Sequence, residues 1–199
     1  MSPTLLAEVP LAPPLDLGPF RLAEYEAWPE GERCELLFGT LYAIPSPSPR
    51  HQLAALLLWR RLHELALSTG GLALAAPVDV VLAEHSVVQP DVIYVSGGRL
   101  GIVREQRIEG APDLVVEVVS PGSARRDRDE KLRLYADAGV REYWLVDPAE
   151  RQIEILVAVE GEYRVQVPVG GDYRSRVTPQ LRLDLIDFWR ELEAAFPRS

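Results

Sequence analysis

The chain has 199 residues, of which 47% are hydrophobic and 26% charged, and its formal net charge is −9. This length and composition are typical of one globular domain with a sizeable core. The negative charge argues against a general, charge-driven nucleic-acid binder, but it does not exclude a nuclease whose carboxylates hold a metal ion.

The N-terminal part is predicted to begin with an extended arm over residues 1–18, which are rich in proline and leucine, ahead of one domain over residues 19–199. A short helix is expected over residues 20–28 and a hairpin over residues 33–44. No basic region followed by an apolar core occurs here, so we expect no signal peptide. The single cysteine, Cys34, is compatible with the reducing cytoplasm.

The next part is predicted to contain one long helix followed by two strands. The helix is expected over residues 51–67 and to end at Gly70-Gly71, with core positions at Leu53, Leu56, Leu57 and Leu65. One strand is expected over residues 72–82, carrying Asp79. The other is expected over residues 87–95, containing Gln89-Pro90-Asp91, before a polar loop over residues 97–110.

A buried strand is predicted within residues 112–121, because its run of Val and Leu is typical of a strand covered on both faces. Strand alternation places Asp113, Val115, Glu117 and Val119 on one face. An ionised carboxylate in the middle of such a strand is costly unless it is paired. Glu117 is therefore expected to have a partner: a cation, a hydrogen-bond network or a metal ion.

A helix is predicted over residues 124–138, with Gly139 at its C-terminal end. Asp127, Lys131 and Tyr135 recur every four residues and share one face of this helix. Lys131 is the only lysine in a chain that otherwise uses arginine, which suggests a position where a compact ammonium is needed. The alternative is a surface lysine paired with Asp127.

The C-terminal part is predicted to contain strands over residues 142–146, 153–159, 163–169 and 181–183, followed by a helix over residues 186–196. The whole order of elements predicts a mixed sheet covered by at least two helices, in the α/β or α+β class. No apolar run approaches about 18 residues, so no membrane span is expected.

Two acids and the lysine are expected to meet if the strands that carry Asp91 and Glu117 are neighbours. Two carboxylates held close together repel, and a divalent cation removes that repulsion. Oxygen ligands of this kind suit Mg²⁺ or Mn²⁺. Such an ion stabilises charge on a phosphodiester and lowers the pKa of a bound water, while a lysine such as Lys131 orients that water or neutralises developing charge.

The sequence resembles the bacterial family of putative restriction-endonuclease-like proteins within the PD-(D/E)XK nuclease superfamily, over roughly residues 20–187. The resemblance rests on several weak motifs that are specific only together and in this order. They are residues 35–39, Ser48 with His51, residues 89–91, residues 112–121, the Asp127/Lys131/Tyr135 stripe and residues 139–148.

The resemblance implies a restriction-endonuclease-like fold and a metal-dependent nuclease that forms a homodimer. DNA is the favoured substrate, although the sequence does not decide between DNA and RNA. Asp91 and Glu117 would be the metal ligands. The superfamily signature expects a lysine two residues after the second acid, where this chain has Val119, and Lys131 is the candidate replacement. Glu35, His51 and Tyr135 are possible accessory residues, Glu35 as a metal ligand and His51 as a phosphate or water contact.

Less specific interpretations remain open from the sequence. Asp91 can cap a turn, Glu117 can be a structural acid paired with Lys131 or an arginine, and His51 can make only a local hydrogen bond at a helix N-terminus. The arginines at positions 125, 126, 128 and 133 form either a phosphate-facing patch or a solvated helix surface. A nuclease fold without catalysis, binding nucleic acid or a protein partner, is the main alternative function, and a purely structural dimer is the third.

Overall fold

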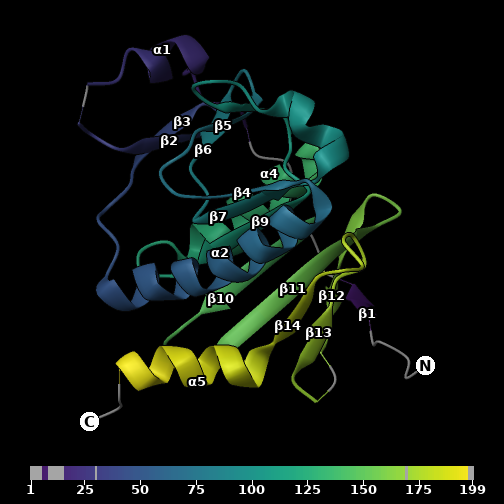
Figure 1. The fold of residues 1–199 in the computed structure, drawn as a ribbon. Helices are drawn as coiled ribbons and strands as arrows, with labels where there is room; N and C mark the ends of the chain where they lie inside the picture. The colour runs from purple at the N-terminus through teal and green to yellow at the C-terminus, as the bar shows by residue number, and fades with distance from the viewer. Residues whose placement is uncertain (1–5, 9–15, 30, 169, 197–199) are drawn as a thin grey trace.

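The structure, a computed structural model, describes residues 6–8, 16–29, 31–168 and 170–196 (Figure 1). Within these residues the largest sheet has seven strands in the order β1-β12-β11-β10-β9-β7-β4. The central strands β9 and β10 are parallel and the other neighbouring pairs are antiparallel. In sheet order, the strands are β1 (Leu6–Glu8), β12 (Glu162–Gln166), β11 (Gln152–Val159), β10 (Glu142–Asp147), β9 (Leu114–Val118), β7 (Val92–Val95) and β4 (Leu72–Ala75).

Two smaller sheets accompany the large one. The first has the order β3-β2-β6-β5-β8, and the second is the hairpin β13-β14. Their strands are β2 (Cys34–Leu37), β3 (Thr40–Ala43), β5 (Val80–Ala83), β6 (Ser86–Val88), β8 (Ile108–Glu109), β13 (Asp172–Arg174) and β14 (Arg182–Asp184).

The helices of the described part are α1 (Leu22–Glu26), α2 (Pro49–Thr69), the 3₁₀ turn η1 (Gly97–Ile102), α3 (Ala124–Arg126), the π-helical turn η2 (Asp127–Lys131), α4 (Leu132–Ala138) and α5 (Leu185–Ala195). Helix α2 begins where the Ser48 side chain accepts a hydrogen bond from the His51 amide at 3.2 Å. It ends at Gly70, whose φ of 70° is left-handed. The expected helix over residues 124–138 is confirmed, with one π turn in its first half.

The core lies on both faces of the seven-stranded sheet. On β9, Leu114, Val116 and Val118 belong to the same hydrophobic cluster as buried residues of α2 and α5, and Figure 1 shows α2 lying across this part of the sheet. Val115 and the following Val119 face α4 and the five-stranded sheet. The predicted alternation is therefore confirmed, and it sends the Glu117 side chain toward the side that holds α4.

Two predictions of a single continuous strand are wrong, because each predicted segment forms two separate strands. The segment 72–82 is divided into β4 and β5, and the segment 87–95 into β6 and β7, with each pair split between the large and the five-stranded sheet. Pro77 and Pro90 lie at the two breaks, where a residue without an amide hydrogen interrupts a ladder. The expected polar loop over residues 97–110 also contains η1 and β8.

Helix α2 has the predicted core positions with one exception. Leu57 and Leu65 are buried and Leu53 packs against the core, but Leu56 is 41% exposed. The buried stripe instead includes Leu58 and Leu62, which are fully buried. Spacing at i, i+4 and i+7 through Leu65 keeps these side chains on the face toward the sheet, and Leu56 falls outside that face.

The remaining elements agree with the expectations. The short N-terminal helix, the hairpin β2-β3, the strands β10 to β12 and the closing helix α5 are present. Of the expected N-terminal arm, Leu6–Glu8 forms β1 beside β12, whereas residues 1–5 and 9–15 lie outside the described part. No helix among the described residues is long and apolar enough to cross a membrane.

Candidate functional site

A cavity of about 560 Å³ lies where the two larger sheets meet the N-terminal ends of α2 and of the α3–η2 helix. Five of the six candidate residues from the sequence line it, and the sixth, Tyr135, contacts one of the five. The lining candidates are Glu35 on β2, His51 on α2, Asp91 just before β7, Glu117 on β9 and Lys131 on η2. The structure therefore brings together residues that are far apart in the sequence.

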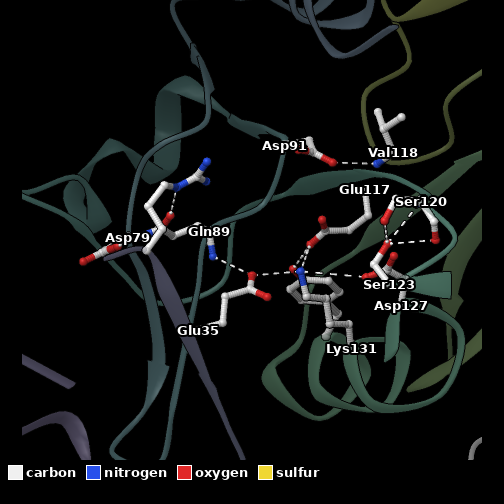
Figure 2. A network of polar contacts seen from close by, with 12 residues as sticks. Glu35, Asp79, Gln89, Asp91, Glu117, Val118, Ser120, Ser123, Asp127 and Lys131 are labelled. Atoms are coloured by element: carbon white, nitrogen blue, oxygen red, sulfur yellow. Dashed lines mark hydrogen bonds and ion pairs between the residues drawn. The ribbon is translucent and has the colours of Figure 1, made fainter. Parts of the chain in front are cut away.

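Lys131 lies at the centre of the acidic residues, as Figure 2 shows. Its Nζ is 2.9 Å from Glu117 Oε1 and 2.8 Å from Glu35 Oε1. Asp127 Oδ1 is 3.9 Å from the same nitrogen. All four residues are at most 4% exposed, so these contacts form away from bulk water, where charge interactions are strongest.

The carboxylates outnumber the cation that neutralises them. Burial raises the pKa of Glu117 well above its usual range, and the negative charges of Asp127, Asp91 and Glu35 add to this effect while Lys131 opposes it. Burial likewise raises the pKa of Asp127. The site thus carries an excess of closely spaced acids, which a bound cation would stabilise.

The protonation of Lys131 follows from the same acids. Burial alone would lower its pKa, but the charges of Glu117, Glu35 and Asp127 outweigh burial and raise it. Lys131 is therefore charged at neutral pH. Tyr135 completes this layer by donating its hydroxyl hydrogen to Glu117 Oε1 at 2.6 Å.

Asp91 joins β9 to the start of α2. Its Oδ2 accepts a hydrogen bond from the Val118 amide at 2.7 Å and lies 3.3 Å from His51 Nε2. Burial lowers the pKa of His51, but the hydrogen bond to Asp91 and the charge of Asp91 outweigh it, so the pKa is raised overall. His51 therefore does more than the local helix contact that the sequence left open, and its Nδ1 is buried without a partner among the described residues.

A second layer of hydrogen bonds holds Glu35 in place (Figure 2). The Gln89 amide nitrogen donates to Glu35 Oε1 at 2.9 Å. The Gln89 side chain donates to Asp79 Oδ1 at 2.9 Å, and Tyr25 on α1 donates to the same oxygen at 2.8 Å. Asp79 thus supports the site from outside the cavity and is not one of its lining residues.

Several residues singled out from the sequence lie elsewhere. Asp113 is fully buried but pairs with Arg99 at 2.9 Å and Arg141 at 3.2 Å, away from the cavity. Of the four arginines of the α3–η2–α4 segment, three pair with acids, and these are Arg125, Arg128 and Arg133. Of these four, only Arg126 lines the cavity.

Sequence reasoning missed some cavity residues. Asp127 was recognised as a helix-face residue but not as a member of the acidic group, although its i, i+4 spacing from Lys131 was the available signal. Arg50, next to His51, was also missed. Of the four arginines that the sequence offered as a phosphate-facing patch, Arg126 lines the cavity, next to Asp127. Ser120 and Ser123 also line it, with their hydroxyls 2.9 Å apart.

The donor set fits Mg²⁺ or Mn²⁺. Hard cations of this size prefer carboxylate oxygens, and Mg²⁺ usually takes one or two carboxylates together with water and phosphate oxygens. Asp91 and Glu117 would supply two carboxylates from neighbouring strands. No group of three or more His, Cys, Asp or Glu side chains in the described part of the chain is arranged for a metal ion, so an ion held by Asp91 and Glu117 would need water or substrate oxygens to complete its coordination.

Comparisons with known proteins agree with this fold. The family model described as Uma2: Putative restriction endonuclease matches residues 22–187. A crystal structure described as a putative nuclease belonging to DUF820, from Anabaena variabilis, superimposes with a TM-score of 0.72 at 19% sequence identity, covering 87% of this chain and 99% of that one. A search of curated proteins found no significant match. The fold is thus restriction-endonuclease-like.

Proposed function

We propose that this chain, which belongs to the Uma2 family described as putative restriction endonucleases, is a metal-dependent endonuclease that hydrolyses phosphodiester bonds of DNA. The observation that carries the proposal is the meeting of Asp91, Glu117 and Lys131 at one cavity. The first two are oxygen donors of the type that Mg²⁺ binds, and the third is a buried, charged ammonium.

The residues of the chain would divide the work as follows. Asp91 and Glu117 would hold Mg²⁺ or Mn²⁺, which supplies Lewis-acid stabilisation of the phosphate and a more acidic bound water. Lys131 would orient the attacking water and stabilise the negative charge that develops on the phosphate. Lys131 reaches the acids from η2. It would thereby replace the strand lysine of the superfamily signature, whose position is occupied by Val119 in this chain.

Accessory residues would fix these groups in place. Tyr135 donates to Glu117 and restricts its rotation, and His51 holds Asp91 from the first turn of α2. Glu35 shares Lys131 with Glu117 and would act either as an additional metal ligand or as the residue that positions the ammonium. Precise positioning of this kind decides how much a catalytic group contributes.

Two further parts of the proposal concern the assembly and the substrate. We propose DNA as the substrate on the basis of the family description as restriction endonucleases. A homodimer is proposed because cleavage of both strands of a duplex needs two active sites. Size-exclusion chromatography with light scattering tests the dimer independently of cleavage.

One observation favours a second candidate function, a nuclease fold that binds nucleic acid or a protein without cleaving. Lys131 contacts both Glu117 and Glu35, so the chain neutralises part of its acidic cluster with its own ammonium. In that case Val119 would mark a lost catalytic lysine. The two functions differ in whether metal binding and cleavage depend on the acids.

The test is cleavage of supercoiled plasmid DNA, and of a folded RNA in parallel, with Mg²⁺ or Mn²⁺ and with a chelator as blank. We expect metal-dependent cleavage by the wild type and its loss in Asp91→Asn and Glu117→Gln. Asp129→Asn is the matched control, because Asp129 is an exposed acid on η2 outside the cavity. Cleavage that survives both site substitutions would overturn the assignment, and no cleavage by the wild type would favour the binding module.

A further inference from the structure

Three arginines line the cavity, and none of them has a carboxylate partner among the described residues. They are Arg33, Arg50 and Arg126. Four acids line the same cavity, so partners of opposite charge are nearby. Arg33 is held in another way, by donating from Nε to Gln89 Oε1 at 3.0 Å. The other two guanidinium groups therefore have hydrogen-bonding capacity that the described chain does not use.

Arg50 lies in the first turn of α2, directly before His51. Its Nε and Nη2 are buried, and neither has a hydrogen-bond partner in the described part of the chain. A guanidinium is always charged, and buried donors without an acceptor are costly. This arrangement is expected where an acceptor from another molecule enters the cavity.

Arg126 approaches the cavity from the other helix, directly before Asp127. Its guanidinium carbon lies 4.1 Å from the centroid of the Tyr42 ring. Tyr42 is itself fixed, because its hydroxyl donates to Glu130 at 2.9 Å. Stacking uses the flat face of a guanidinium and leaves its in-plane N–H groups able to donate.

We propose that Arg50 and Arg126 together bind a backbone phosphate of the nucleic acid, next to the phosphodiester that is cleaved. Each arginine adjoins a residue of the acidic site, so a phosphate held between them would place the neighbouring bond near Asp91 and Glu117. The planar fork of arginine matches phosphate oxygens, and such contacts position a nucleic acid without reading its sequence. This inference rests on the proposed nuclease function, but its test does not require cleavage.

The test measures binding of a fluorescein-labelled 20-base-pair DNA duplex by anisotropy, in a Glu117→Gln background that keeps the duplex uncut, at a series of salt concentrations. Removing one phosphate contact is expected to lower the slope of log affinity against log salt by about one. Arg50→Ala and Arg126→Ala are each expected to weaken binding roughly tenfold as well. Arg50→Lys and Arg126→Lys should retain the salt slope but bind more weakly, because they keep the charge and lose the fork.

Matched controls come from the same two helices. Arg60 on α2 pairs with Glu191 at 2.6 Å, and Arg128 on η2 pairs with Glu154 at 2.8 Å, both outside the cavity. Arg60→Ala and Arg128→Ala should leave affinity and salt slope unchanged.

The phosphate site would be overturned if the Glu117→Gln protein did not bind the duplex. It would also be overturned if Arg50→Ala and Arg126→Ala in that background bound the duplex as tightly as Glu117→Gln alone. Arginine-dependent binding together with a wild type that never cleaves would support the phosphate site and overturn the nuclease function instead. The two proposals can therefore fail separately.

Discussion

The Nζ of Lys131 on η2 lies 2.9 Å from Oε1 of Glu117 on β9, and both side chains are buried. This pair connects β9, one of the two central strands of the large sheet, to the helix that covers it. It also holds the only lysine of the chain against an acid whose pKa is raised by burial. Stability and the proposed chemistry therefore depend on the same contact.

Lys131→Met should destabilise the protein strongly, by about 3–5 kcal/mol, because it leaves Glu117, Glu35 and Asp127 buried without their cation. Urea unfolding at neutral pH measures this change in the free energy of unfolding. Arg128→Met is the control, since its pair with Glu154 is partly exposed and such pairs contribute about 1 kcal/mol or less. Equal losses in the two variants would contradict the buried acidic cluster.

Moving the lysine to Val119 should restore part of the activity that Lys131→Met removes. Val119 lines the same cavity as Lys131 and follows Glu117 by two residues on the same strand face. We expect Lys131→Met to lower the cleavage rate at least about 100-fold, and Lys131→Met/Val119→Lys to recover about tenfold or more. The double variant Lys131→Met/Val119→Met has a side chain of similar length without the ammonium and should recover nothing; equal rates for the two double variants would refute the prediction.

Glu142 should make the protein less stable as the pH rises. Burial raises the pKa of Glu142, and hydrogen bonds from Ser175, Tyr173 and Trp144 only partly oppose this. A raised pKa in the folded state contributes stability below the unfolded value of about 4.3, and this contribution is lost as the pH rises through the folded pKa. Glu142→Gln should therefore become more stable relative to the wild type as the pH rises from about 4 toward 7, measured by urea unfolding at each pH.

Asp113 provides the opposite case for the same measurement. Burial would raise its pKa, but hydrogen bonds from Ser96 and Arg99 outweigh burial and lower it. Its contribution is present above the unfolded pKa and is lost as the pH falls through the folded value. Asp113→Asn should thus be less stable than the wild type at neutral pH, with the difference shrinking in acid. Parallel pH curves for the wild type and both variants would contradict these assignments.

Leu58 and Leu56, two residues apart on α2, should respond very differently to truncation. Leu58 is fully buried against the large sheet and Leu56 is 41% exposed. Leu58→Ala should cost about 2–5 kcal/mol through lost burial and a cavity, whereas Leu56→Ala should change the free energy of unfolding by less than about 0.5 kcal/mol. Urea midpoints of the two variants measure the contrast, and a larger loss for Leu56→Ala would mean that the face of α2 is misassigned.

Much of the fold could be predicted from local patterns. The Val-rich run around Glu117 specified β9, and Gly70 marked the end of α2. The start of α2 was expected at residue 51, two residues after its observed start at Pro49. The splitting of 72–82 and 87–95 between two sheets could not be predicted, because continuous apolar runs do not record which partner strand each half meets. Only the tertiary structure shows that the strands before and after Pro77, and those before and after Pro90, belong to different sheets.

The site was predicted in part for a similar reason. The sequence placed Glu117 and Lys131 on known faces of a strand and a helix, so their contact could be anticipated. The positions of Arg50 and Arg126 at the cavity could not be anticipated. Both helices carry several arginines, and the sequence does not show which of them lacks an acidic partner. That information lies in long-range pairing with residues such as Glu154.

The most direct test of the central claim is calorimetric titration of Mn²⁺ into the wild type and into Glu117→Gln, each with a non-cleavable phosphorothioate duplex present to supply phosphate oxygens. We expect metal binding by the wild type that is lost in Glu117→Gln, with Asp129→Asn binding as the wild type does. Binding that is the same in the wild type and Glu117→Gln, or absent from both, would contradict a metal centre at Asp91 and Glu117.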